Sequence, residues 1–259
     1  MLSAALITLN EEHNLERTLA SVRSLAGEIV VVDCGSTDAT LEIARQFGAK
    51  VFREEWKGYG TQKNSAIAKC TGEWVLSLDA DEAVEPELAA EIKALLEGKA
   101  GASPPLANGY FIPRKNFFLG RWMKQGGFWP DPKIRLFRRG TGQFEERKVH
   151  ETMRVNGPVG MLRGALSHHT YPTLEGYLAQ MNRYSSLGAQ MGVAGGQRGF
   201  SLLNIVLRPK LTFLYNYVLR LGFLDGKEGL LLHLYHACYV SWKYAKVWEL
   251  SRKTARSRP

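Results

Sequence analysis

Short apolar runs recur along the first eighty positions, and each is followed by a stretch with helical spacing. The four runs are predicted strands, at 2–8, 28–33, 49–53 and 74–78. After the first run, Leu15, Leu19 and Val22 recur at intervals of three and four residues, which indicates a helix with one buried face. Strands that alternate with helices predict an α/β protein whose mostly parallel sheet is flanked by helices.

A stretch rich in Gly, Pro and Ala at 99–108 ends this alternation. Further strands are expected at 109–114, 133–138 and about 147–155. A glycine-rich stretch at 192–199 marks the next boundary. We therefore predict a catalytic domain at 1–195, with a donor-binding half at about 1–98 and an acceptor half at about 108–190, and then a basic, aromatic-rich helical region at 196–259.

Positive charge is concentrated at the end of the chain. From Arg198 onward there are eleven Lys and Arg residues and three acidic ones, which gives +8 of the total net charge of +9. A nearly neutral body with a basic, aromatic-rich end predicts an anionic surface as partner. A nucleic-acid-binding module typically has a basic stripe across its fold. Because the charge here is confined to one end, we expect a membrane surface and no nucleic acid.

The remaining composition favours a cytoplasmic protein. Cys34, Cys70 and Cys238 lie far apart and form no CxxC pair, so neither a structural zinc site nor a disulfide framework is expected. The first apolar run has no basic leader and is interpreted as a buried strand, not a signal peptide.

Acidic and amide side chains follow three of the predicted strands. Asn10 and Glu11 follow the first, Asp33 ends the second, and Asp79-Ala80-Asp81 ends the fourth. Ligands of open α/β sheets bind outside the carboxyl ends of the strands. Two carboxylates one residue apart at such an edge can reach a ribose and a divalent cation together, and hard oxygen ligands suit Mg²⁺ or Mn²⁺.

Two common nucleotide motifs are absent. The chain has neither GxGxxG nor GxxxxGK[ST], which counts against a dehydrogenase and a P-loop NTPase. A nucleotidyltransferase with a similar sheet remains an alternative. That class usually has a glycine-rich basic loop after the first strand, whereas this chain has Leu9-Asn10-Glu11-Glu12 there.

Several segments together resemble inverting family 2 glycosyltransferases of the GT-A fold, and most closely the bacterial lipopolysaccharide core β-1,4-glucosyltransferases. The segments are ALITLNE at 5–11, IVVVDCGSTDAT at 29–40, GYGTQKN at 58–64, LSLDADE at 76–82, WPDPKIRLFRR at 129–139, KVHE at 148–151 and SHHTYPTLEGYL at 167–178. The QxxRW motif of processive synthases is absent, which favours the addition of one sugar per encounter.

The resemblance implies roles for individual residues on the donor side. Thr8, Asn10, Glu11 and Asp33 are expected to bind the nucleotide, with Glu11 and Asp33 on the uridine. Lys63 is expected near the diphosphate, Asp79 at the ribose and Asp81 on the metal, with His168 or His169 as a further metal ligand.

On the acceptor side, an inverting transfer needs one general base. The Glu-Asp pair usual in the family is absent, and Val149-His150-Glu151 occupies the corresponding stretch. Glu151 is the candidate base, with Glu145 or Glu146 as substitutes. Trp129, Asp131 and Arg135 are expected to line the acceptor.

The implied reaction is transfer of a hexose, glucose from UDP-glucose, to a heptose of the lipopolysaccharide core. A polyprenyl phosphate or another envelope glycan is the alternative acceptor. The enzyme is expected to act at the inner face of the cytoplasmic membrane, and it could form a homo-oligomer.

The basic end is expected to supply the membrane contact. The apolar centre of its last helix, at 229–242, is shorter than the roughly 20 residues needed to span a bilayer. Five aromatic residues suit the headgroup level: Tyr235, Tyr239, Trp242, Tyr244 and Trp248. Six basic residues suit anionic lipid: Lys243, Lys246, Arg252, Lys253, Arg256 and Arg258. Helices packed on the catalytic domain or on a second copy are the alternative.

Overall fold

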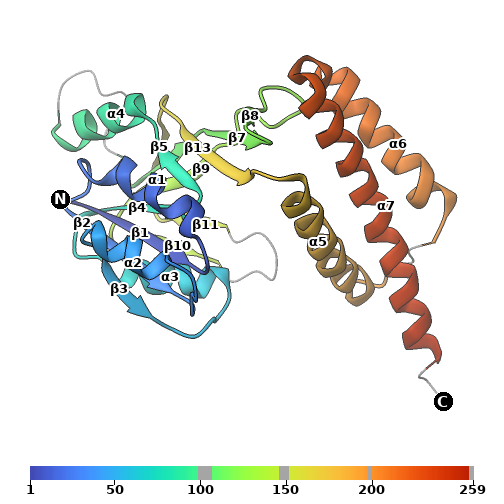
Figure 1. The fold of residues 1–259 in the computed structure, drawn as a ribbon, viewed down its shortest axis with the longest axis horizontal. Helices are drawn as coiled ribbons and strands as arrows, with labels where there is room; N and C mark the ends of the chain where they lie inside the picture. Colours follow the sequence, from blue (N-terminus) through green and yellow to red (C-terminus); the bar gives the residue numbers. More distant parts are fainter. Residues whose placement is uncertain (99–106, 146–151, 198–199, 257–259) are drawn as a thin grey trace. The chain divides into compact units, whose positions relative to one another are not determined.

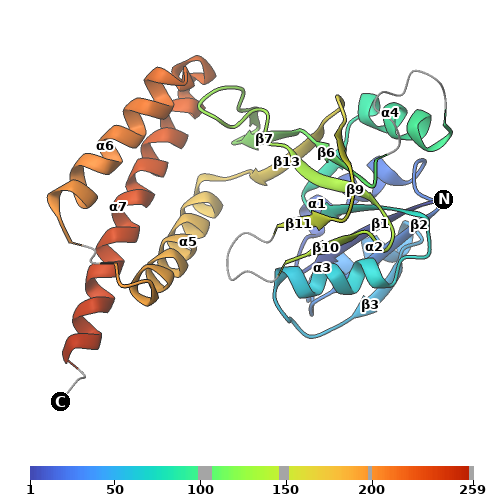
Figure 2. The same cartoon turned by 180° about the vertical axis from the view of Figure 1, so that it is seen from behind.

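The computed structural model describes residues 1–98, 107–145, 152–197 and 200–256. Their contacts divide the chain into two compact units, Met1–Lys115 with Pro130–His169, and Asn116–Trp129 with Thr170–Pro259. Figures 1 and 2 show the elements of both units from opposite sides.

The first unit is built on a seven-stranded sheet in the order β12-β6-β9-β4-β1-β2-β3. Its strands are β1 (Leu2–Thr8), β2 (Glu28–Asp33), β3 (Lys50–Arg53), β4 (Trp74–Asp79), β6 (Gly109–Ile112), β9 (Lys133–Arg138) and β12 (Val159–Met161). The pairs that link β3, β2, β1 and β4 are parallel, as is the pair of β12 with β6, whereas β9 is antiparallel to both its neighbours. The predicted mostly parallel α/β fold is confirmed.

Helices cover both faces of this sheet. They are α1 (Glu12–Val22), α2 (Thr40–Gln46), α3 (Tyr59–Ala68) and α4 (Pro86–Leu96). Side chains alternate across a strand, so Ile29 and Val31 of β2 pack in one core with α1, α2 and α4, while Val30 and Val32 pack in a second core with α3. Burial on both faces explains why this strand is a continuous apolar run.

Short strands complete the first unit. They are β5 (Glu82–Val84), which pairs antiparallel with β13 (Leu166–Tyr171), and β10 (Gly142–Phe144), which pairs with β11 (Met153–Val155). Asn64 of α3 fixes the β10–β11 hairpin. Its Nδ2 donates to the carbonyl of Phe144 at 2.9 Å, and its Oδ1 accepts from the Phe144 N–H at 2.8 Å. The chain passes between the units within β7 (Arg114–Phe118) and β13.

The second unit is mainly helical. It contains β8 (Arg121–Trp122), α5 (Leu174–Ala194), a continuous helical run of Leu203–Leu207, α6 (Arg208–Phe213) and Leu214–Leu219, a 3-10 turn at Gly222–Asp225, and α7 (Gly226–Arg256). Both α5 and α6 lie along α7, on different sides of it (Figures 1 and 2). Phe118, Met123, Tyr177, Met181 and Leu232 form the core of this unit.

The sequence placed a domain boundary at 195/196, inside the second unit. Composition changes there, but α5 before that point packs on α7 after it. The domain bounds therefore stay a prediction. Among the helices that the structure describes, none combines the length and the apolar character that crossing a bilayer requires.

Candidate active site

The carboxyl ends of three parallel strands meet at one edge of the sheet. In the register of these strands, Thr8 lies beside Asp33, and Ile7 lies beside Asp79. The loops after β1, β2 and β4 therefore begin at the same level. The polar residues that the sequence places after these strands lie at this one edge.

The loops after β1 and β2 are joined by hydrogen bonds. Asn10, which has a positive φ of 55°, donates its N–H to Ser36 Oγ at 2.8 Å, and its Oδ1 accepts from the Thr37 N–H at 2.9 Å. Thr40 Oγ1 accepts from the Glu11 N–H at 2.8 Å. These contacts hold the backbone of the first loop against the second.

Asp33 shapes the second loop. Its side chain is fully buried, and its Oδ1 accepts from the N–H groups of Gly35 and Ser36, each at 3.0 Å. Its Oδ2 accepts from the hydroxyls of Ser36 and of Thr8, the latter at 3.1 Å. Because donors from the protein surround both oxygens, the structure explains Asp33 and Thr8 as organisers of the loop. Their contact with a nucleotide stays a prediction.

Glu11 faces the acidic side of the edge. Burial raises the pKa of its carboxyl, and the nearby charges of Asp81, Asp38 and Asp79 raise it further, against a hydrogen bond from Asn14 Nδ2 that lowers it. A carboxyl with a raised pKa can donate a hydrogen bond when it is protonated, as well as accept one when it is ionised. Both uses suit the edge of a nucleobase.

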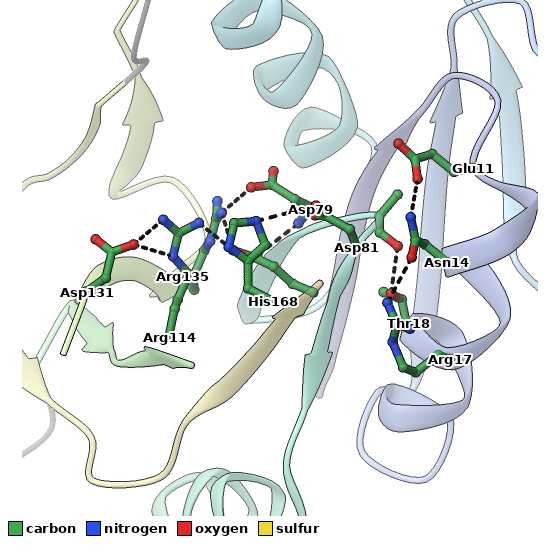
Figure 3. A network of polar contacts seen from close by, with 12 residues as sticks. Glu11, Asn14, Arg17, Thr18, Asp79, Asp81, Arg114, Asp131, Arg135 and His168 are labelled. Carbon is green, nitrogen blue, oxygen red and sulfur yellow. Dashed lines mark hydrogen bonds and ion pairs between the residues drawn. The ribbon is translucent and has the colours of Figure 1, made fainter. Parts of the chain in front are cut away.

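Asp79 is the centre of a network of buried charges (Figure 3). Its Oδ1 lies 2.6 Å from Lys63 Nζ, and its Oδ2 pairs with the Arg135 guanidinium. Burial alone would raise the pKa of Asp79, but the charges of Arg135 and Lys63 hold that pKa well below its ordinary value. The two cations therefore favour the ionised form of Asp79.

Glu82 extends this network and was not identified from the sequence. Its side chain is fully buried, and its Oε1 accepts from Arg135 at 2.7 Å and from Arg114 at 2.9 Å. Its Oε2 accepts from the Asp79 N–H at 3.0 Å. One carboxylate thus fixes two guanidiniums and the backbone of the Asp79-Ala80-Asp81 segment.

A signal for this network does exist in the sequence. Arg135 interrupts the apolar run of β9, and a charge inside a buried strand requires a partner. That partner could be sought among the acidic residues around β4, where Asp79 and Glu82 both lie. The structure therefore places Arg135, expected on the acceptor side, next to Asp79, expected on the donor side.

Asp81 lies apart from these cations and close to a histidine. Its Oδ2 is 3.4 Å from His168 Nε2. The His169 N–H donates to the Asp81 carbonyl at 3.0 Å, so β13 fixes the backbone of Asp81 as well. Burial and the charges of Arg17 and His168 lower the pKa of His169, although the carboxylate of Asp81 acts in the opposite direction. These effects favour the neutral form of His169.

The donor set at Asp81 fits a cation that is completed by substrate. Across the described ranges, no cluster contains three or more His, Cys, Asp or Glu side chains placed to hold a metal. Mg²⁺ in nucleotide sites is usually bound by one or two carboxylates, with substrate phosphates and water as the other ligands. Asp81 with His168 matches that pattern, and imidazole also accepts Mn²⁺.

The residues expected at the acceptor are only partly described. Glu151, the candidate base, and Glu146 lie outside the described residues. Glu145 forms an ion pair with Arg154. Asp131 accepts from Arg114 Nε at 3.1 Å and lies 3.0 Å from Lys133 Nζ. Burial raises the pKa of Asp131, but these two cations outweigh that effect and lower the pKa to about 2.

Trp129 belongs to the second unit, where its ring meets the Trp122 ring edge to face, with centroids 5.3 Å apart. The roles of Glu151, Trp129, Asp131 and Arg135 toward an acceptor stay predictions.

A mostly parallel sheet with carboxylates gathered at the carboxyl ends of its strands is typical of α/β proteins that bind a ligand at this edge. The glycosyl transferase family 2 model matches residues 3–169, and the chain belongs to that family. The protein is therefore a glycosyltransferase. This excludes the nucleotidyltransferase alternative and a purely nucleic-acid-binding module. The resemblance seen in the sequence and the expected GT-A fold are both confirmed.

The similarity extends over the full chain in several relatives. A lipopolysaccharide core biosynthesis glycosyltransferase of Rhizobium meliloti, LpsC, is 30% identical over all of this chain and 95% of its own length. An uncharacterized glycosyltransferase of Rickettsia typhi is 31% identical over 98% of this chain and 88% of its own. Among solved structures, Staphylococcus aureus TarS 1–349 in complex with UDP-GlcNAc covers 98% of this chain and 92% of that one, with 16% identity and a TM-score of 0.50.

Proposed function

We propose that this enzyme transfers a hexose, glucose from UDP-glucose, to a heptose of the lipopolysaccharide core, with inversion at the sugar carbon. The observation that carries the proposal is the pair of Asp81 and His168 at the strand edge, beside the buried network of Asp79, Lys63 and Arg135. The named function of the Rhizobium meliloti relative supports the acceptor class. The complex of TarS with UDP-GlcNAc is consistent with a uridine donor.

Each side of the site has a different task in this reaction. Asp81 and His168 would hold Mg²⁺ or Mn²⁺, which offsets charge on the leaving diphosphate when it is bound. Lys63 and Arg135 lie on the other side of Asp79 and give this edge fixed positive charge. Glu11, with its raised pKa, suits the uracil edge, and Asp79 suits the ribose hydroxyls.

The acceptor is activated by one carboxylate. Glu151 would take the proton from the attacking hydroxyl on the face opposite the leaving nucleotide, as a single-displacement inverting transfer requires. The charge developing on the leaving group is balanced by groups already in place, so little reorganisation is needed during the step.

The acceptor lies at a membrane in this proposal. The enzyme would be a cytoplasmic protein bound peripherally at the inner face of the membrane, where lipid-linked substrates expose their sugars. A polyprenyl phosphate or another envelope glycan is the alternative acceptor of the same chemistry. A second copy of the chain is a possible further partner.

A donor panel tests the proposal. Purified enzyme is titrated with UDP-, GDP- and dTDP-glucose in a calorimeter, with Mn²⁺, with Mg²⁺ and with EDTA. We expect uptake of the UDP-sugar that depends on metal, and transfer to heptose-terminated core oligosaccharide detected by mass spectrometry. Metal-dependent binding without transfer to that acceptor leaves the donor assignment intact and moves the acceptor to the polyprenyl phosphate class. Absence of any UDP binding overturns the proposal.

A further inference from the structure

The helical run of the second unit has one apolar side that its own unit leaves uncovered. Leu203, Leu207, Leu211, Leu214 and Val218 recur at intervals of four, four, three and four residues, which places them on one side of the run. Their exposed fractions lie between 40% and 52%. Further exposed apolar residues continue this side to Leu224, which is 54% exposed. We call the exposed side of 202–224 the apolar face.

The opposite side of the run is fixed against α7. Pro209 is buried, Ser241 Oγ donates to the carbonyl of Ile205 at 3.0 Å, and Arg208 donates to the hydroxyl of Tyr244. The run therefore has a defined orientation, with its polar anchors turned to α7. The apolar face is the side that remains exposed.

The exposed charges within 202–224 have one sign. The sequence contains no Asp or Glu between Glu175 and Asp225. Asp225 is buried and accepts from the N–H groups of Lys124 and Gln125, at 3.2 and 2.8 Å. Exposed charges within the run are cationic, and they come from Arg208, Lys210 and Arg220.

Most of the aromatic residues that the sequence favoured for this contact pack within the second unit, and so does Lys246, whereas the side chains of Lys253, Arg256 and Arg258 lie outside the described residues. Tyr235, Tyr239 and Trp242 pack against the core of the second unit, and Tyr244 is buried. Lys246 Nζ donates into α5, to Asn182 Oδ1 at 2.6 Å and to nearby hydroxyls. Only Trp248 is both aromatic and exposed in that set.

We propose that the apolar face lies in the interface of an anionic bilayer, with the helical run parallel to the membrane plane. Monomeric soluble proteins rarely expose contiguous apolar patches of this extent. A helix with an apolar face flanked by Lys and Arg typically inserts about 5–10 Å into the headgroup and acyl boundary. The run of 203–219 is about 25 Å long, which suits a surface-lying helix. The inference rests on the proposed function in placing the acceptor at a membrane.

Lipid is a better occupant than a second copy of the chain. A two-fold contact between two such faces would bring Lys210 and Arg220 of both copies together without an acidic partner in either run. Phosphate and carboxylate headgroups supply the missing negative charge. Charge complementarity therefore selects an anionic membrane surface.

The test is co-sedimentation of the full chain with vesicles of phosphatidylcholine alone and with 30% phosphatidylglycerol. We expect the wild type to bind the anionic vesicles at low salt. Its partition coefficient should be at least tenfold lower when 0.5 M NaCl is added, and also when the vesicles are neutral. The variant Leu207→Glu/Leu214→Glu/Val218→Glu should lose at least tenfold in partition coefficient. The matched control is Met191→Glu, which places a charge at a 49% exposed apolar position of α5, outside the face.

Circular dichroism and UDP titration of each variant separate this inference from the proposed function. A triple variant that folds and binds UDP but binds anionic vesicles as the wild type does would overturn the inference and leave the donor site intact. A wild-type protein that binds neither kind of vesicle would also overturn the inference. A wild-type dimer in sedimentation velocity that the triple variant dissociates, without any lipid binding, would assign the face to a second copy instead.

Discussion

Lys63 Nζ lies 2.6 Å from Asp79 Oδ1, which joins a helix on one face of the sheet to the end of a central strand. Lys63 also lies over the ring of Phe144, with its Nζ 5.1 Å from the ring centroid. Asp79 in turn pairs with Arg135 of β9. Residues of α3, β4 and the distant strand β9 are therefore fixed around one carboxylate, two residues before the predicted metal ligand Asp81.

The two aspartates should respond differently to replacement by asparagine. Asp79→Asn leaves two buried cations with one carboxylate fewer, and we expect a loss of about 3–5 kcal/mol in the free energy of unfolding. Asp81→Asn should change that free energy by less than about 1 kcal/mol, because the described partner of the Asp81 side chain is the imidazole of His168 and not a buried Lys or Arg. The same variant should weaken metal-dependent UDP binding at least tenfold. Urea unfolding and calorimetry measure the two effects. Equal stability losses in both variants would contradict the division of roles.

Glu82 should act as a positioning residue. Glu82→Gln keeps the shape of the side chain but removes the negative charge between Arg114 and Arg135. We expect a loss of about 3 kcal/mol in stability and a fall in kcat, with little change in the affinity for metal and UDP. The matched variant is Glu85→Gln, which removes one partly exposed ion pair with Lys115 and should be nearly neutral. If Glu82→Gln retains full activity, the network has no part in positioning the site.

Asn64 should control the β10–β11 hairpin. Asn64→Ala leaves the N–H and the carbonyl of Phe144 without their partner, at a cost of about 1–3 kcal/mol for each group that stays buried. Asn64→Asp keeps an acceptor for the N–H and loses only the donor, so its loss of stability should be the smaller one. Thermal unfolding of the two variants compares them directly. A larger loss in Asn64→Asp would show that charge, and not the paired hydrogen bonds, dominates at this position.

His233 should make the protein sensitive to mild acid. It is 1% exposed, and neither ring nitrogen has a hydrogen-bond partner among the described residues. Burial and the charges of His236 and Arg220 lower the pKa of His233 to about 4, although the charge of Asp225 acts in the opposite direction. Between about pH 4 and 6.5 the unfolded chain binds a proton that the folded protein does not, so stability falls as the pH is lowered through this window.

The size of this effect can be measured. We expect His233 to account for about 2 kcal/mol of lost unfolding free energy between pH 7 and pH 5. His233→Leu should remove that part of the slope, whereas His13→Gln should not, because the His13 side chain is 92% exposed. Urea unfolding at pH 7, 6 and 5 gives the three slopes. An unchanged slope in His233→Leu would contradict the assignment.

Glu151→Gln tests the general base. Donor and metal binding should remain, while kcat should fall about 10²–10⁴-fold, as expected when a general base is removed. Glu145→Gln is the control, because Glu145 pairs with Arg154. Retained transfer in Glu151→Gln together with loss in Glu145→Gln would move the base to Glu145.

The sequence by itself determined the elements and the family. The strands β1, β2 and β4 are runs of local apolar character, and Asp33 and Asp79 are the last residues of β2 and β4 in the structure, so the local pattern was enough to place these two residues at one edge of the sheet. The segments around the Asp79-Ala80-Asp81 motif were sufficient to recognise a family 2 glycosyltransferase. These features depend on residues close together in the chain.

Only the tertiary structure decided which charges meet and which apolar side stays uncovered. Arg135 reaches Asp79 and Glu82 because β9 pairs antiparallel with β4, a register that no local pattern specifies. The sequence alone does not tell whether the aromatic residues of α7 or the leucines of 202–224 are the exposed set. Packing on α5 and the second-unit core buries much of the first set and leaves the second exposed. Which distant segments pack together depends on the packing of the whole unit. The periodicity of apolar residues along the chain does not predict it.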